Sequence, residues 1–185
     1  MTASARTIAI ILLVSLPLAL FARGVDFQRV ELSLSEDGYI LLDAEIGYDL
    51  NETVSEALEN GVPLTFQIHV QMRREKAWIW EADVVEHRLR TVLRYRPLSG
   101  LYELRNLAGE EKIAFATRDA ALRALGRIVA MPIVQRETLG LDQEYLVRID
   151  AKLDVEALPL PMRPRAYLDR DWSIEGEPWE WRFRP

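Results

Sequence analysis

Hydrophobic and polar residues alternate along most of the chain from Val25 onward, a pattern typical of β-strands with one buried face. The first two alternating stretches, Val30 to Leu34 and Ile40 to Tyr48, flank the acidic turn at residues 36–38. Alternation on both sides of an Asp-Gly turn predicts a β-hairpin. The most regular alternation, from Leu64 to Met72, predicts a further strand.

Beyond the charged turn at residues 73–76 the alternation continues, but the parity of its hydrophobic residues changes. A β-bulge near Val85 to His87, or a bend into a new strand, explains the change. Four more stretches predict strands: Trp78 to Val84, Leu101 to Leu107, Tyr145 to Leu153 and Trp179 to Phe183.

Two segments have helical spacing instead. Thr53 and Glu56 have the spacing of a capping box before a short helix that ends at Asn60-Gly61. Thr117 opens a longer helix whose apolar stripe runs from Ala121 to Val129, with Pro132 as its end. About seven or eight strands with two short helices inserted in connections predict a mainly β protein, an immunoglobulin-like β-sandwich.

The N-terminus breaks this pattern. Ile8 to Phe21 is apolar except for Ser15 and Pro17, and it is shorter than the roughly 20 residues that a membrane span needs. It fits the hydrophobic region of a secretory signal, with small residues for cleavage after Gly24. We therefore expect residues 1–24 to be a signal peptide or signal anchor, and residues 25–185 to be one β-sandwich domain of a bacterial envelope protein. A buried N-terminal helix is the third interpretation. The location is the periplasm, or the inner membrane facing the periplasm if the segment is not cleaved.

Charge and cysteine content disfavour or exclude several classes of function. The chain has 185 residues, with 23 Lys and Arg against 29 Asp and Glu, and a net charge of −6. This charge disfavours nucleic acid as a partner, because a phosphate-backbone binder needs a basic face. The absence of cysteine excludes disulfides, thiolate nucleophiles and cysteine-based zinc sites.

Catalytic motifs are also missing. The chain contains no Gly-x-Ser-x-Gly, Ser-x-x-Lys, phosphate-loop or dinucleotide-binding motif. Its two histidines, His69 and His87, do not form a metal-ligand pattern. We expect no catalytic residues, no metal and no cofactor, and hence a protein that is not an enzyme. One alternative stays open: Asp169, Asp171 and Glu175 could serve a metal-dependent hydrolase.

Two sets of residues are candidates for binding. Tryptophans two positions apart face one side of a strand, where they are either core or an aromatic platform for a glycan or another envelope polymer, and the core interpretation is favoured. Four arginines of equal parity form either a contact for an anionic group or a solvated sheet face. These candidate residues are Trp78, Trp80, Trp179 and Trp181, and Arg88, Arg90, Arg94 and Arg96.

Several segments together resemble a known family. They are residues 61–66, Trp78-Ile-Trp80, residues 93–102, the helix from Thr117, Leu153-Asp154 with residues 158–161, and the ending with Trp172, Trp179 and Trp181. In order and spacing they resemble the proteobacterial envelope family known as domain of unknown function 4390. The family has no assigned activity, and its genes often lie beside those of a membrane sensor kinase and a response regulator. The resemblance thus implies an accessory protein whose partner is an envelope protein, such as that sensor kinase. A glycan-binding module is the alternative to this protein-binding role.

Overall fold

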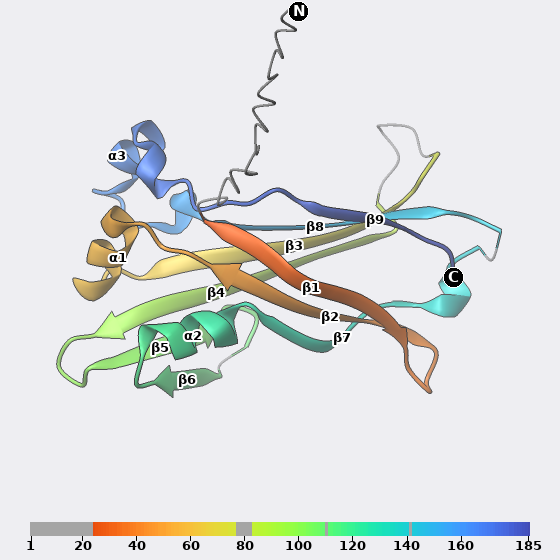
Figure 1. Ribbon diagram of the computed structural model, residues 1–185, viewed down its shortest axis with the longest axis horizontal. Helices are drawn as coiled ribbons and strands as arrows, with labels where there is room; N and C mark the ends of the chain where they lie inside the picture. The colour runs from red at the N-terminus through yellow and green to blue at the C-terminus, as the bar shows by residue number, and fades with distance from the viewer. Residues whose placement is uncertain (1–23, 77–82, 110, 141) are drawn as a thin grey trace, which may run out of the picture.

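Two antiparallel sheets stacked face to face form the protein in the computed structural model, which describes residues 24–76, 83–109, 111–140 and 142–185 (Figure 1). The prediction of a mainly β protein with a sandwich of sheets is confirmed. The three-stranded sheet has the order β1-β2-β7 and the six-stranded sheet the order β6-β5-β4-β3-β8-β9. The strands are β1 (Val25–Leu34), β2 (Tyr39–Tyr48), β3 (Leu64–Arg74), β4 (Val85–Arg96), β5 (Leu101–Asn106), β6 (Lys112–Phe115), β7 (Arg127–Gln135), β8 (Tyr145–Leu153) and β9 (Trp179–Phe183).

The core lies between the two sheets, where the alternating hydrophobic residues meet. Even-numbered side chains of β2 and β3 and odd-numbered side chains of β8 are buried there. Tyr48 of β2 packs edge-on against Phe66 of β3, with ring centroids 5.1 Å apart. Because every second residue of β3 is buried on this side, the residues between them must face outward. The candidate site therefore lies on the outer face of the six-stranded sheet.

Of the two explanations for the change of parity, the bulge near Val85 to His87 is wrong and the new strand is correct. β4 begins at Val85 and pairs with β3 without a shift from Met72↔Val85 to Leu64↔Leu93. The change of parity therefore marks the start of a new strand. Most of the predicted strand from Trp78 to Val84 falls on residues 77–82 and lies outside the described residues.

The two predicted helices are found, with corrected boundaries. Helix α1 (Glu52–Glu59) is capped by Asn51 and not by Thr53, since the Asn51 side chain accepts a 3.0 Å hydrogen bond from the Val54 amide. Helix α2 (Arg118–Leu125) begins after Thr117 as predicted but ends at Leu125.

The predicted extension of α2 to Val129 is wrong, because the chain joins the three-stranded sheet instead. The Gly126 carbonyl accepts a 2.9 Å hydrogen bond from the Ile46 amide of β2, and Arg127–Gln135 continues as strand β7. β-Branched residues of this segment favour a strand. Pro132 is tolerated in β7 because that strand is at the edge of its sheet.

A third helix, α3 (Arg163–Leu168), lies in a segment for which the sequence predicted neither a helix nor a strand. Pro164 occupies its first turn, where a missing amide hydrogen costs no intrahelical bond. The short 3-10 helices Val155–Ala157 and Arg170–Trp172 flank α3. No helix of the described residues is long and apolar enough to cross a membrane.

The start of β1 is tied to the segment that follows α3. Gly24 forms a bridge with Glu175, and its carbonyl accepts a 2.8 Å hydrogen bond from the Asp49 amide. Phe27 of β1 lies 6.5 Å from Trp179 of β9, measured between ring centroids. Figure 1 shows the start of β1 and helix α3 at the same end of the sandwich. Residues 1–23 of the predicted signal segment, which comprises residues 1–24, lie outside the described residues.

Candidate functional site

The outer face of the six-stranded sheet is covered by polar side chains of both charges. These side chains stand next to one another across four strands, because the registers pair outward-facing residues with outward-facing residues. We call this surface the mosaic face. It consists of Gln67, His69 and Gln71 of β3, Glu86, Arg88 and Arg90 of β4, Arg148, Asp150 and Lys152 of β8, and Glu180 of β9.

His69 is at the centre of the mosaic face, between two carboxylates. Its Nε2 atom lies 3.1 Å from Glu86 Oε1, and its Nδ1 atom lies 3.6 Å from Asp150 Oδ1. Arg88 Nη2 approaches the same Glu86 oxygen to 2.6 Å. Arg88 first, and His69 second, hold the pKa of Glu86 below its usual value of 4.5. The contacts of His69 thus connect β3 with β4 and β8.

All four candidate arginines belong to β4, and their shared parity directs them to the outer side of the sheet. Arg88 pairs with Glu86, Arg90 pairs with Asp154 at 2.6 Å, and Arg96 pairs with Glu103 at 3.2 Å. Arg94 stands opposite Glu103 in the β4–β5 ladder. The stripe is therefore interleaved with acids, as the solvated-face interpretation expects.

A cleft of about 730 Å³ is formed where the mosaic face meets the chain between β8 and β9. Arg88 and Arg90 of the stripe line the cleft together with two of the candidate carboxylates, Asp169 and Glu175. Two groups of residues predicted separately are thus brought to one place. Sequence analysis missed the further charged residues of the cleft, Lys152, Asp154, Glu156 and Arg170. The alternation of β8 could have identified Lys152, because it lies between the buried residues Ala151 and Leu153.

Each of the three candidate carboxylates accepts a hydrogen bond from a neighbouring group of the protein. Asp169 accepts a 3.1 Å hydrogen bond from the Asp171 amide, and Glu175 accepts one of 2.9 Å from the Ser173 hydroxyl. Asp171 faces a different hollow, beside Thr53, and does not line the cleft. Among the described residues, no group of three or more histidines and acids is placed to hold a metal ion.

The tryptophans of β9 face the inside of the sandwich. Trp181 pairs with Val147 and packs against the core, and Trp179 lies opposite Ile149 on the same side. Trp179 is 40% exposed, because β9 is at the edge of its sheet. Trp78 and Trp80 lie outside the described residues. Trp172, to which the sequence assigned no role, is buried beneath the cleft.

The second histidine also faces inward. His87 Nε2 lies 3.0 Å from the Ile133 carbonyl oxygen of β7, so the contact joins the two sheets. A neutral imidazole must carry its proton on Nε2 to donate this hydrogen bond. His87 is thus placed to contribute to sheet packing.

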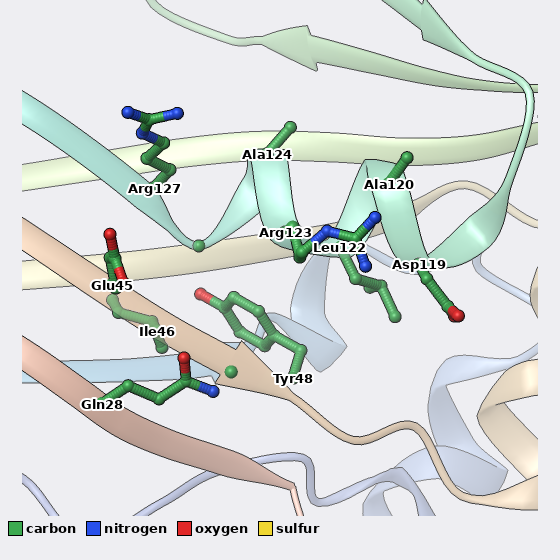
Figure 2. Close-up of a pocket in the computed structure, with 12 residues that line it drawn as sticks. Gln28, Glu45, Ile46, Tyr48, Asp119, Ala120, Leu122, Arg123, Ala124 and Arg127 are labelled. Atoms are coloured by element: carbon green, nitrogen blue, oxygen red, sulfur yellow. The ribbon is translucent and has the colours of Figure 1, made fainter.

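A second hollow, of about 660 Å³, lies between β2 and α2 (Figure 2). The buried Tyr48 hydroxyl lines it and has no hydrogen-bond partner among the described residues, and burial raises the pKa of Tyr48. Its other polar lining includes Glu45, Asp119 and Arg123. Sequence analysis predicted Tyr48 only as a strand residue, because strand alternation does not tell whether a buried hydroxyl finds a partner.

Comparison with known families gives one match. The model of a family described as domain of unknown function (DUF4390) matches residues 22–182, which confirms the resemblance seen in the sequence. No curated protein and no solved structure matches the chain.

Proposed function

The chain belongs to the family described as domain of unknown function (DUF4390), and from that premise we propose that it is a non-enzymatic protein-binding module of the bacterial envelope. Its location is the periplasm, or the periplasmic side of the inner membrane. Its binding surface is the mosaic face with the adjoining cleft. The family description assigns no activity.

The observation that supports the proposal best is the pairing of charges across the mosaic face. Arg88 and Arg90 each lie 2.6 Å from a carboxylate oxygen, and Arg148 lies 2.7 Å from Glu180. A surface that binds nucleic acid or another polyanion needs an excess of positive charge. A fixed pattern of both charges instead selects a partner with the complementary pattern, which is how charge sets register and specificity between proteins.

Other uses of the site have less support. Asp169 and Glu175 each accept a hydrogen bond from a residue two positions away in the chain, which favours a structural role over acid–base or metal chemistry. Trp179 and Trp181 face the interior, so this pair gives no support to a glycan platform. A protein partner fits a broad charged sheet face better than a small molecule does, since small-molecule sites are predominantly apolar and enclosed.

The family resemblance suggests a membrane sensor kinase as the partner. Its extracytoplasmic part would contact the mosaic face, and the module would act as an accessory to the kinase. The contact needs no cofactor, and its strength would fall with ionic strength because exposed charges are screened by salt.

Site-directed crosslinking in cells tests the proposal. The photoreactive amino acid p-benzoylphenylalanine replaces Arg88, whose side chain is 59% exposed and paired with Glu86. The matched control replaces Arg29 of β1, which is 57% exposed and paired with Glu31 in the same way. We expect a discrete adduct with one membrane protein from position 88 and not from position 29. The charge reversal Arg90→Glu should weaken the adduct.

Two outcomes would contradict the proposal. One is the absence of any discrete adduct from position 88 although the variant accumulates normally. The other is the formation of the same adducts from positions 88 and 29, which would mean that the partner does not bind the mosaic face in preference to the rest of the surface.

A further inference from the structure

Helix α3 and the turn before it expose large apolar side chains to solvent. Leu160 is 73% exposed, Tyr167 61% and Leu168 89%. Scattered apolar residues on a surface are ordinary, but three within one short segment form a candidate contact surface. We call this segment, residues 160–170, the α3 patch.

The exposure follows from the way the segment packs. Leu158 and Ala166 are buried and Met162 packs against the core, so the positions spaced by four residues from 158 to 166 face inward. Leu168 follows Ala166 by two residues in α3, and two residues of helix turn a side chain by about 200°, so Leu168 points away from the core. Leu160 lies in the turn before α3, between the buried Leu158 and the core-packed Met162, and its side chain is exposed there.

Positive charge accompanies these apolar residues. The α3 patch contains Arg163, Arg165 and Arg170 and one acid, Asp169, in a chain whose acids outnumber its bases by 29 to 23. None of the three arginines forms an ion pair within the part of the chain that the structure describes. Arg163 donates a 2.7 Å hydrogen bond to the Leu158 carbonyl and thereby helps to hold the segment.

The α3 patch also lies near the point at which the apolar N-terminal sequence meets the fold. Gly24 bridges Glu175, and the 3-10 helix Arg170–Trp172 that precedes Glu175 contacts α3 (Figure 1). The apolar sequence ends at Phe21. Three residues reach at most about 10 Å, so the expected signal anchor, where it is retained, would keep this end of the sandwich close to the bilayer.

We propose that the α3 patch binds the surface of an anionic phospholipid membrane. Leu160, Tyr167 and Leu168 enter the interfacial region, and the arginines contact lipid phosphates, a combination typical of interfacial segments. The inference rests on the envelope location in the proposed function, and it does not depend on the protein partner.

The absence of cysteine in the chain makes a direct test simple. The variant Leu168→Cys carries the polarity-sensitive fluorophore NBD on the full chain, in vesicles of phosphatidylglycerol and phosphatidylethanolamine. The matched control is Leu98→Cys with the same label, since Leu98 lies in the β4–β5 turn and is fully exposed at 106%. We expect blue-shifted emission and quenching by spin-labelled lipids at position 168 and neither effect at position 98.

Charge variants separate this binding from non-specific adsorption. In Arg165→Gln/Arg170→Gln, the ratio of docked to undocked label should fall about tenfold or more, because each arginine near an anionic surface contributes about one kcal/mol. Vesicles of phosphatidylcholine alone should give a similar fall. The variant Arg29→Gln, which removes an arginine from β1, should leave the ratio unchanged.

A label at position 168 that stays as exposed to water as the label at position 98 would overturn the inference, and would leave a protein as the occupant of the α3 patch. Equal burial of both labels would overturn it too. Because these vesicles contain no partner protein, failure here is distinct from failure of crosslinking at position 88.

Discussion

Two arginine-bearing surfaces of this protein differ in what surrounds the arginines. On the mosaic face, Arg88, Arg90 and Arg148 each lie within 2.7 Å of a carboxylate oxygen. In the α3 patch, Arg165 and Arg170 form no ion pair with any described carboxylate, and the exposed Leu160 and Leu168 belong to the same segment. The same residue type therefore supports two kinds of contact.

The groups around each arginine decide what that arginine can contact. A paired arginine adds little net charge, and it presents a pattern that a protein can match. An unpaired arginine beside apolar surface offers its charge to an external anion, and its neighbours offer hydrophobic contact. The two surfaces meet at the cleft, which Tyr167 and Arg170 of the α3 patch also line. A change beneath the cleft should therefore affect both surfaces, and changes to Arg90 or Arg165 should affect one of them.

The largest effect is expected from Trp172→Ala. Trp172 is buried, lines the cleft and belongs to the 3-10 helix that contacts α3, so it supports both surfaces. Removing a buried tryptophan leaves a cavity and costs about 3–5 kcal/mol of unfolding free energy. Chemical denaturation followed by circular dichroism measures the loss, and crosslinking at position 88 and vesicle docking should both decline.

The matched control for this prediction is Trp179→Ala. Trp179 is 40% exposed at the edge of its sheet and contacts Phe27, so the same change removes less buried surface. Its cost should be clearly smaller than that of Trp172→Ala. Equal costs would mean that Trp172 is no more important to the fold than an edge residue.

A smaller effect is expected from the arginines themselves. Arg90→Ala leaves Asp154, whose side chain is 14% exposed, without its 2.6 Å partner and should cost about 1 kcal/mol. Arg165→Ala breaks no ion pair with a described residue and should change the unfolding free energy by less than about 0.5 kcal/mol. The same denaturation measurement compares them. A cost for Arg165→Ala as large as that for Arg90→Ala would remove the distinction between the two surfaces.

The sequence predicts the strands well and the junction after α2 poorly, for a physical reason. Alternation reports burial on one face, so the strands containing Leu64 to Met72 and Tyr145 to Leu153 could be found directly. Helical spacing continues past Leu125, but the Ile46 amide donates a hydrogen bond to the Gly126 carbonyl, and the chain joins a sheet from there. That bond joins residues far apart in the sequence, and local periodicity does not report it.

The candidate site, too, could be predicted only in part from the sequence. Parity predicts that Arg88 and Arg90 share a face, and the structure agrees. Which acids neutralise them depends on register and on the chain after β8, so the pairing of Arg90 with Asp154 could not be predicted. The α3 patch escaped prediction because Pro164, which indicates an irregular segment in a sequence, begins a helix here.

The smallest effect is expected in the pH dependence of stability, which should differ between variants of the two surfaces. Arg88, followed by His69, lowers the pKa of Glu86 in the folded protein below 4.5, whereas the unfolded chain keeps the usual value. Ionised Glu86 therefore stabilises the fold above that value, and this stabilisation is lost as the pH falls through the lowered pKa. We expect Glu86→Gln to be less stable than the wild type at neutral pH, by a difference that shrinks below pH 4.5 and disappears in stronger acid.

Arginine does not titrate in this range, so any effect of Arg165→Gln on stability should be independent of pH. Denaturation at a series of pH values measures both differences, and a Glu86→Gln difference that persists unchanged in acid would mean that the carboxylate is not paired in solution.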